Sequence, residues 1–112
     1  MKKIAKKKNI LKPSIQKEAS LSKESDISRK IAGLDSWDYD GRAIMRRFGF
    51  ENFLKGLDFV NIVAREAEKM GHHPDIFLTY SQVTVILSTH DKRSVTEKDI
   101  ELAKRIDNMV NR

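Results

Sequence analysis

The stretch ENFLKGLDFVNIVAREAEKMGHHPDIFLTYSQVTVILSTH, residues 51–90, decides the fold of this 112-residue chain. Hydrophobic residues in its first half recur three and four positions apart, the spacing that places side chains on one face of an α-helix. The centre of this stripe is Phe53, Leu57, Val60, Ala64 and Ala67, widened by Phe59, Val63 and Met70. We therefore predict a long helix that begins after Asn52.

Glycine and proline end this helix and place two histidines just beyond it. Gly71 stands where a left-handed residue commonly terminates a helix, and Pro74 prevents the helix from resuming. His72 and His73 are therefore expected in the connection that follows.

The second half of the stretch alternates in the manner of a β-strand with one buried face. Val83, Val85 and Leu87 share one parity, and the surrounding segment is rich in β-branched residues. We predict a hairpin with strands at 75–80 and 82–89.

A second predicted hairpin precedes the long helix. Asp40-Gly41 separates the runs 37–39 and 42–50, and this dipeptide is typical of a two-residue turn in which both residues have positive φ. Ile44, Arg46, Phe48 and Phe50 share one parity, so the phenylalanine face is expected to meet the core.

Helices are also predicted at both ends of this unit. A short helix spans residues 22–31, with Ser22 as N-cap and Gly33 after its end. In the last segment Thr96 and Asp99 resemble a capping box. The apolar positions of the helix that follows are Ile100, Ala103, Ile106 and Val110. The order αββαββα predicts an α+β fold, an antiparallel sheet with its helices packed on one face.

Composition sets the class of protein. A chain of this length has room for one domain, since single cores commonly occupy about 100 to 150 residues. With 39% hydrophobic and 34% charged residues it resembles a soluble globular domain, and no apolar run approaches the roughly 20 residues that cross a membrane. The lack of cysteine excludes a disulfide framework, a thiolate metal site and a cysteine nucleophile. It also fits a reducing compartment, so we expect a cytoplasmic protein.

The net charge of +6 belongs to the N-terminal tail. Residues 1–17 hold seven lysines and no acidic residue, which leaves 15 basic and 16 acidic residues at 18–112. We predict a disordered lysine-rich tail at 1–20 and one domain at 21–112, because a lysine run cannot offset its ordering entropy. A targeting sequence, or weak contact with nucleic acid or an anionic membrane, is an alternative for the tail; a basic nucleic-acid surface on the body is not supported.

The three histidines of the chain, His72, His73 and His90, all fall at the ends of predicted elements. Imidazole titrates nearest neutrality, so such a cluster is suited to proton transfer with a bound substrate. Surface histidines and a three-histidine zinc site are the alternatives. A metal is not expected, since adjacent His72 and His73 point in divergent directions. The sequence contains neither a glycine-rich phosphate loop after a strand nor a GxSxG elbow.

The spacing of these histidines resembles a known signature. Its elements are Glu68, His72-His73-Pro74, Tyr80, His90 and Asp99, with Trp37, Asp40-Gly41-Arg42, Phe48, Phe50, Phe53 and the stretch 87–90 as context. Over roughly residues 26–110 the chain is similar to the pterin-4a-carbinolamine dehydratases. The resemblance implies a four-stranded antiparallel sheet with three helices and assembly as a homodimer or homotetramer. It implies removal of water from 4a-hydroxytetrahydropterin, as in tetrahydrobiopterin recycling, with His72, His73 and His90 catalytic and without cofactor or metal.

Further site residues follow from the same resemblance and from position. The predicted substrate-binding residues are Gly71, Pro74, Ser88, Thr89, Asp91 and Trp37. Trp37 is as often a core residue, and hydroxyl groups at a strand end are common in any case. Glu68 either orients a histidine or is a solvated helix residue, and Asp99 either pairs with a histidine or only caps its helix, with capping favoured. Ser94, where many relatives have glycine, puts the shape of its loop in doubt.

The resemblance also implies a non-enzymatic alternative. Members of the family serve as dimerisation cofactors for a homeodomain transcription factor, through a helical surface separate from the histidines. A nucleic-acid-binding lysine tail is a further alternative, which predicts salt-sensitive binding that is lost with residues 1–17.

Overall fold

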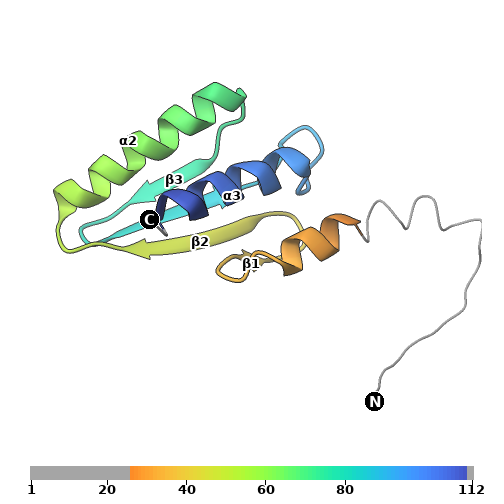
Figure 1. Cartoon of the computed structure of the whole chain (residues 1–112), viewed down its shortest axis with the longest axis horizontal. Helices are drawn as coiled ribbons and strands as arrows, with labels where there is room; N and C mark the ends of the chain where they lie inside the picture. The colour runs from red at the N-terminus through yellow and green to blue at the C-terminus, as the bar shows by residue number, and fades with distance from the viewer. Residues whose placement is uncertain (1–25, 111–112) are drawn as a thin grey trace, which may run out of the picture.

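The computed structural model describes residues 26–110. Its elements are a helical segment at 26–32, β1 (Asp38–Tyr39), β2 (Ile44–Gly49), α2 (Phe53–Met70), β3 (Asp75–Leu78), β4 (Gln82–Leu87) and α3 (Glu97–Val110), as Figure 1 shows. The predicted α+β order is confirmed. The predicted tail at 1–20 and the N-cap Ser22 lie outside the described residues. No helix between residues 26 and 110 is both long and apolar enough to cross a membrane.

The four strands form one antiparallel sheet in the order β1-β2-β4-β3. Ile44 pairs with Leu87 and Phe48 with Val83, so the apolar parities of β2 and β4 lie on the same face. All four side chains are buried, whereas Met45 and other residues of the opposite parity are partly or fully exposed. The predicted alternation is confirmed, and it leaves one face of the sheet for the helices to cover.

Both long helices cover that face. On α2, the Phe59 ring lies 4.7 Å from the Phe48 ring, centroid to centroid. On α3, Asp107 accepts a hydrogen bond from Arg46, which has the same parity on β2 as Phe48. Figure 1 shows α2 and α3 side by side over the sheet. The helical segment 26–32 reaches the start of α3 through an ion pair between Lys30 and Glu97.

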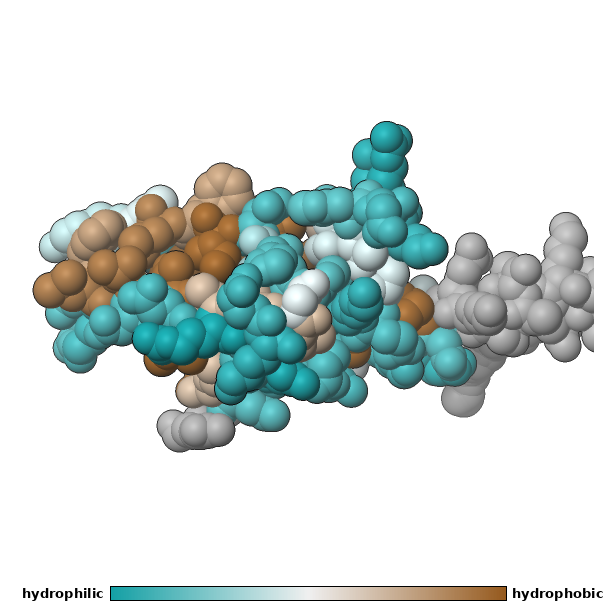
Figure 2. Space-filling view, turned by 90° about the horizontal axis from the view of Figure 1, so that it is seen from above, coloured by the Kyte–Doolittle hydropathy of each residue, from teal (hydrophilic) through white to brown (hydrophobic). Residues whose placement is uncertain are grey.

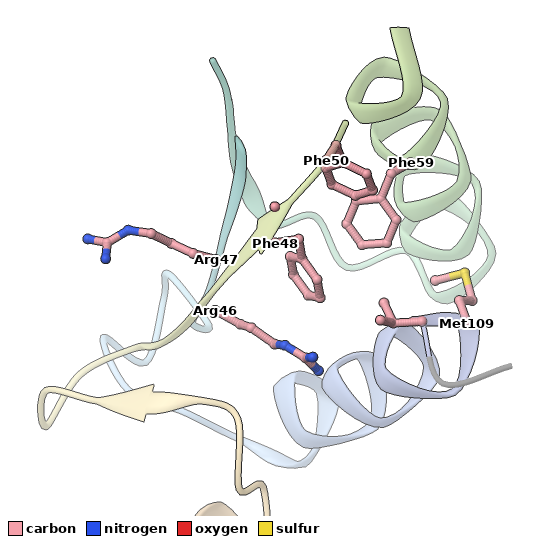
Figure 3. Close-up of a pocket in the computed structure, with 8 residues that line it drawn as sticks. Arg46, Arg47, Phe48, Phe50, Phe59 and Met109 are labelled. Carbon is pink, nitrogen blue, oxygen red and sulfur yellow. The ribbon is translucent and has the colours of Figure 1, made fainter. Parts of the chain in front are cut away.

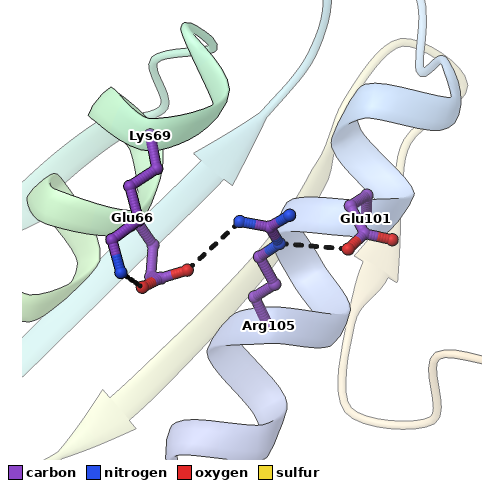
Figure 4. A network of polar contacts seen from close by, with 4 residues as sticks. All are labelled: Glu66, Lys69, Glu101 and Arg105. Carbon is purple, nitrogen blue, oxygen red and sulfur yellow. Dashed lines mark hydrogen bonds and ion pairs between the residues drawn. The ribbon is translucent and has the colours of Figure 1, made fainter.

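A polar clamp joins the two helices. Arg105 of α3 donates to Glu66 of α2 at 3.3 Å and to Glu101 at 3.0 Å, and Lys69 donates to the second oxygen of Glu66 at 3.0 Å (Figure 4). The hydrogen bond from Lys69, and then that from Arg105, hold the pKa of Glu66 below its ordinary value. The clamp lies one turn before the C-terminus of α2, which carries the histidines.

The predicted long helix is confirmed, but the centre of its apolar stripe is displaced, since Ala67 is the one buried residue of the five placed there. Phe53 and Leu57 are 43% and 37% exposed, and the buried residues are Gly56, Phe59, Val63 and Ala67. A Cβ at Gly56 would lie 3.1 Å from the Leu78 side chain, so glycine allows a close approach of the helix to the sheet there. The buried face of α2 therefore includes a glycine, which a pattern of hydrophobic residues does not reveal.

The predicted type of the first turn is also wrong, although the hairpin itself is confirmed. Tyr39 pairs with Ile44, and Gly41 has a φ of 97° whereas Asp40 does not have a positive φ. The Asp40 carboxylate accepts from the backbone N–H groups of Arg42 at 2.8 Å and Ala43 at 2.9 Å. This side chain closes the turn, so Asp40 need not adopt the left-handed conformation.

Candidate active site

The C-terminus of α2 sends its two histidines in different directions. Gly71 has a φ of 62°, and its N–H donates to the Glu68 carbonyl while the His72 N–H donates to the Ala67 carbonyl. These two bonds form a Schellman motif, which reverses the chain within two residues. His72 is therefore turned inward at 9% exposure, and the His73 side chain is 62% exposed.

His72 pairs with a fully buried carboxylate. Its Nε2 lies 2.6 Å from Oδ1 of Asp99, whose exposure is 0%. Oδ2 of Asp99 accepts from the Thr89 hydroxyl at 2.8 Å and from the Thr96 N–H at 2.9 Å. Since a carboxylate accepts hydrogen bonds, Nε2 carries the hydrogen in this pair, which leaves Nδ1 to exchange a proton with a ligand.

Asp99 therefore serves both of the roles considered for it. It caps α3 through the Thr96 N–H and holds His72 through its other oxygen. The preference for a capping role alone is wrong, because the capped end of α3 packs directly against the inward-facing imidazole. A capping aspartate one turn into a helix has two oxygens, and its cap uses one of them.

His73 belongs to a separate pair. Its Nε2 lies 2.5 Å from Oε2 of Glu68, and both side chains are largely exposed. Glu68 thus orients a histidine while it remains solvated, which combines the two alternatives considered for it. Exposed pairs of this kind contribute little stability, on the order of 0 to 1 kcal/mol.

His90 lies in a tight loop, and the hydroxyl of the preceding residue, Thr89, links this loop to Asp99 by a hydrogen bond. Thr89 and Ser94 form an isolated bridge with a Thr89 N–H to Ser94 carbonyl bond of 2.9 Å, and the Arg93 N–H donates to the His90 carbonyl at 3.2 Å. Arg93 has a φ of 51°, so the left-handed residue of this loop stands one position before Ser94. His90 itself is exposed. His72 and the residue before His90 therefore share one carboxylate.

A hollow of about 310 Å³ opens beside this network. It is lined by Thr89, Asp91, Lys92, Thr96, Glu97 and Lys98. Of the predicted substrate-binding residues, Thr89 and Asp91 line it. Gly71 and Pro74 flank the two adjacent histidines, and Ser88 is partly buried just after β4. Sequence reasoning missed the lining lysines and the contribution of Thr96 to the network, because it treated Thr96 only as a cap.

The structure places Trp37 apart from the histidine network. The indole is buried, and its N–H donates to Oδ1 of Asp107 at 2.8 Å, the same oxygen that Arg46 reaches at 2.6 Å. Its ring meets Phe48 edge-on. Asp107 lies eight residues beyond Asp99 on α3, about 12 Å along the helix axis. Trp37 therefore joins β2 to α3 in the core.

A second cleft, of about 360 Å³, lies between β2, α2 and the end of α3. Figure 3 shows Phe48, Phe50, Phe59 and Met109 pointing into it, whereas Arg47 points away from it. It holds none of the predicted site residues. Within residues 26–110, no three His, Cys, Asp or Glu side chains are grouped so as to hold a metal ion.

Comparison with known proteins assigns the chain to a family. The family pattern described as Pterin 4 alpha carbinolamine dehydratase matches residues 20–109. A protein of Sulfolobus acidocaldarius, provisionally named pterin-4-alpha-carbinolamine dehydratase, is 40% identical over 83 residues, covering 74% of this chain and 91% of that one. One of the same name from Thermosynechococcus vestitus is 42% identical over 85 residues, covering 76% and 90%.

A solved structure is similar as well. The transcriptional coactivator/pterin dehydratase from Brucella melitensis superposes with a TM-score of 0.70 at 37% identity, covering 76% of this chain and 93% of that one. The fold, the histidine spacing and the match to relatives over nearly their full length all agree. The chain therefore belongs to the pterin 4 alpha carbinolamine dehydratase family, a family of hydro-lyases.

Proposed function

We propose that this chain removes water from a 4a-hydroxytetrahydropterin by general acid-base catalysis, with His72, His73 and His90 as the catalytic residues. The observation that carries the proposal is the buried Asp99 carboxylate, which holds His72 through Nε2 and anchors Thr89, the residue before His90. This arrangement keeps one nitrogen of His72 free for proton exchange and supports two histidines from one group.

The reaction needs two proton transfers, which imidazoles can supply. Hydroxide is a poor leaving group, so an acid must protonate the 4a-hydroxyl as the C4a–O bond breaks. The N5 lone pair forms the C4a=N5 bond, and a base removes the N5 proton. The products are quinonoid dihydropterin and water, and the enzyme regains its starting protonation after one proton exchange with solvent.

The three histidines then have distinct parts. His72 and His90 act as the acid and the base, in an order that the two epimers of the substrate can reverse, and His73 orients the ring. His72 reacts through Nδ1, since Asp99 engages Nε2. Glu68 fixes the exposed imidazole of His73 in turn.

The substrate is proposed to occupy the space between the histidines and the neighbouring hollow. Thr89 and Asp91 line that hollow and are candidates to hydrogen-bond the pterin. Contacts from Gly71, Pro74 and Ser88 stay predictions, as does contact with Trp37, whose N–H is engaged by Asp107. A cytoplasmic role in tetrahydrobiopterin recycling, downstream of pterin-dependent hydroxylases, is also a prediction.

One assay tests the function. Chemically made 4a-hydroxytetrahydropterin is mixed with the enzyme, and dehydration is followed with and without a chelator. We expect turnover to persist in chelator and to fall about 100- to 10,000-fold in His72→Ala. Lys104→Ala, an exposed change on α3, is the control for nonspecific effects. Unchanged turnover in His72→Ala would refute the assignment, and loss of turnover in chelator would point to a metal.

We further propose that two copies of the chain associate through β3 and the flank of α2 beside it. β3 is an edge strand, with backbone groups free to pair on its outer side among the described residues. At 100° per residue, Phe53 and Leu57 lie on the flank of α2 opposite Glu66, which faces α3. That flank therefore lies toward the β3 edge, because Gly56 packs on Leu78.

A second copy fits this surface better than an unrelated partner. An edge strand and an apolar flank related by a two-fold axis are self-complementary, since each copy presents both features. Viewed from above α2, hydrophobic residues gather at the end of the molecule where α2 begins (Figure 2). The Brucella melitensis relative is described as a transcriptional coactivator, so a helical protein partner at this surface is the alternative outcome of the same test.

A further inference from the structure

The hydroxyl of Thr96 is turned away from the helix that it precedes. In a capping box the threonine hydroxyl accepts the N–H three residues on. Here the Asp99 N–H donates instead to the Thr96 carbonyl at 3.0 Å, and the Thr96 hydroxyl lies 2.6 Å from the Thr89 hydroxyl. Of the two capping-box hydrogen bonds, the one from the Thr96 N–H to Asp99 is present, whereas the Thr96 hydroxyl contacts Thr89 instead of the Asp99 N–H.

The count of hydrogens fixes the direction of that contact. A hydroxyl has one hydrogen to donate, and Thr89 donates its own to Asp99 at 2.8 Å. Thr89 must then accept from Thr96. The bonds run in one direction, from Thr96 to Thr89 and from Thr89 to Asp99, and Asp99 accepts Nε2–H of His72 through its other oxygen.

We infer that Thr96 is a positioning residue for His72, acting through Thr89 and Asp99. The inference rests on the proposed function for its catalytic consequence, but its geometry does not. With the Thr96 donor present, the Thr89 hydrogen has one favourable direction, toward Asp99. Without it, the Thr89 hydroxyl can rotate, and the buried carboxylate loses a fixed donor on Oδ2. Oδ2 then keeps the Thr96 backbone N–H as its one fixed donor, so the carboxylate plane, and the imidazole that Oδ1 holds, are less firmly oriented.

Two substitutions separate this role from helix capping. Thr96→Val keeps the shape of the side chain and removes the donor, whereas Thr96→Ser keeps the donor. We expect Thr96→Val to lower kcat about 3- to 10-fold with little change in KM, the size expected for one neutral hydrogen bond. Thr96→Ser should restore most of kcat. Thr79→Val is the matched control, because Thr79 donates its hydroxyl to the Gln82 carbonyl in the β3–β4 turn.

A spectroscopic measurement reads the same inference without turnover. Nε2 of His72 lies 2.6 Å from Oδ1 of the buried Asp99. The proton on Nε2 should therefore give a low-field imidazole resonance in the ¹H NMR spectrum. We expect this resonance to shift or broaden in Thr96→Val and to return in Thr96→Ser, with no change in Thr79→Val. The resonance tests the positioning role even if the wild-type protein fails to dehydrate the pterin, so the two failures are distinguishable.

Either of two results would overturn the inference. One is an unchanged His72 resonance in Thr96→Val. The other is a loss of kcat in Thr96→Val that Thr96→Ser shares in full, with both following the loss of unfolding free energy, since that pattern belongs to a purely structural residue.

Discussion

At the residue scale, one buried carboxylate connects local structure to chemistry. Asp99 caps α3 through the Thr96 N–H and pairs with His72 through its second oxygen. A carboxylate with 0% exposure would be costly if any of its donors were missing. Helix stability and imidazole orientation are therefore coupled in a single side chain, so a change at Asp99 affects both.

The left-handed conformation of Arg93 gives a prediction at this scale. A non-glycine residue with a φ of 51° costs about 1 kcal/mol, which glycine would not incur. We expect Arg93→Gly to raise the free energy of unfolding by up to about 1 kcal/mol, measured by urea denaturation. Lys92→Gly is the matched control; the φ of Lys92 is not positive, so this change should destabilise the protein. An equal loss of unfolding free energy in both variants would show that the left-handed conformation of Arg93 is not strained.

At the element scale, helix ends and turns aim the functional side chains. The Schellman motif at Gly71 sends His72 inward and His73 outward. The bridge between Thr89 and Ser94 closes the loop that carries His90. Irregular backbone thus positions these side chains, and the regular elements hold that backbone in place.

A substitution at Gly71, the C-cap of α2, tests how much this helix end contributes to stability and activity. An alanine there meets no atom within 4 Å, so the cost of Gly71→Ala arises only from the φ of 62°. We expect a loss of about 1 kcal/mol in the free energy of unfolding and a lower kcat, because both histidines depend on this turn. Gly49→Ala is the control, since it also meets no atom within 4 Å and has no positive φ. If the two variants unfold alike, the left-handed cap is not important.

The first turn predicts a pH dependence. The backbone N–H of Arg42, and then that of Ala43, lower the pKa of Asp40 below its ordinary value of 3.8. A depressed folded-state pKa contributes stability that is present above the unfolded value and is lost as the pH falls through the folded value. The stability advantage of wild type over Asp40→Asn should therefore shrink below about pH 4, as followed by urea unfolding. An advantage that is constant across pH would contradict this account.

At the scale of the whole molecule, a one-sided sheet leaves surface that the chain itself does not cover. The helices bury the face that carries Ile44 and Val83, and the edge of β3 and the adjoining flank of α2 stay open among the described residues. Exposed apolar residues beside an open strand edge favour association over a monomer.

Light scattering tests the association. We expect wild type to have the mass of a dimer or tetramer, and Leu57→Asp to shift it toward the monomer, because the new charge would be buried at the interface. Asn108→Asp, which adds a charge to an exposed polar position of α3, away from the proposed interface, is the matched control. A monomeric wild type that binds a helical peptide would favour the partner alternative.

Local patterns in the sequence determined the order of the elements, the buried parity of β2 and β4, and the place of the histidines at element ends. These features depend on neighbours within a few residues, which periodicity and turn chemistry register. The spacing from Glu68 to Asp99 also carries the resemblance to the family, which depends on the sequence alone.

Only the tertiary structure decided which groups meet. His72 and Asp99 are 27 positions apart, and Trp37 and Asp107 are 70 apart. Such pairs depend on how α3 packs against the end of α2 and against β2, and no local pattern encodes that packing. The same holds for the hydroxyl of Thr96, which contacts that of Thr89, and for Gly56, where the Leu78 side chain leaves little room for a Cβ.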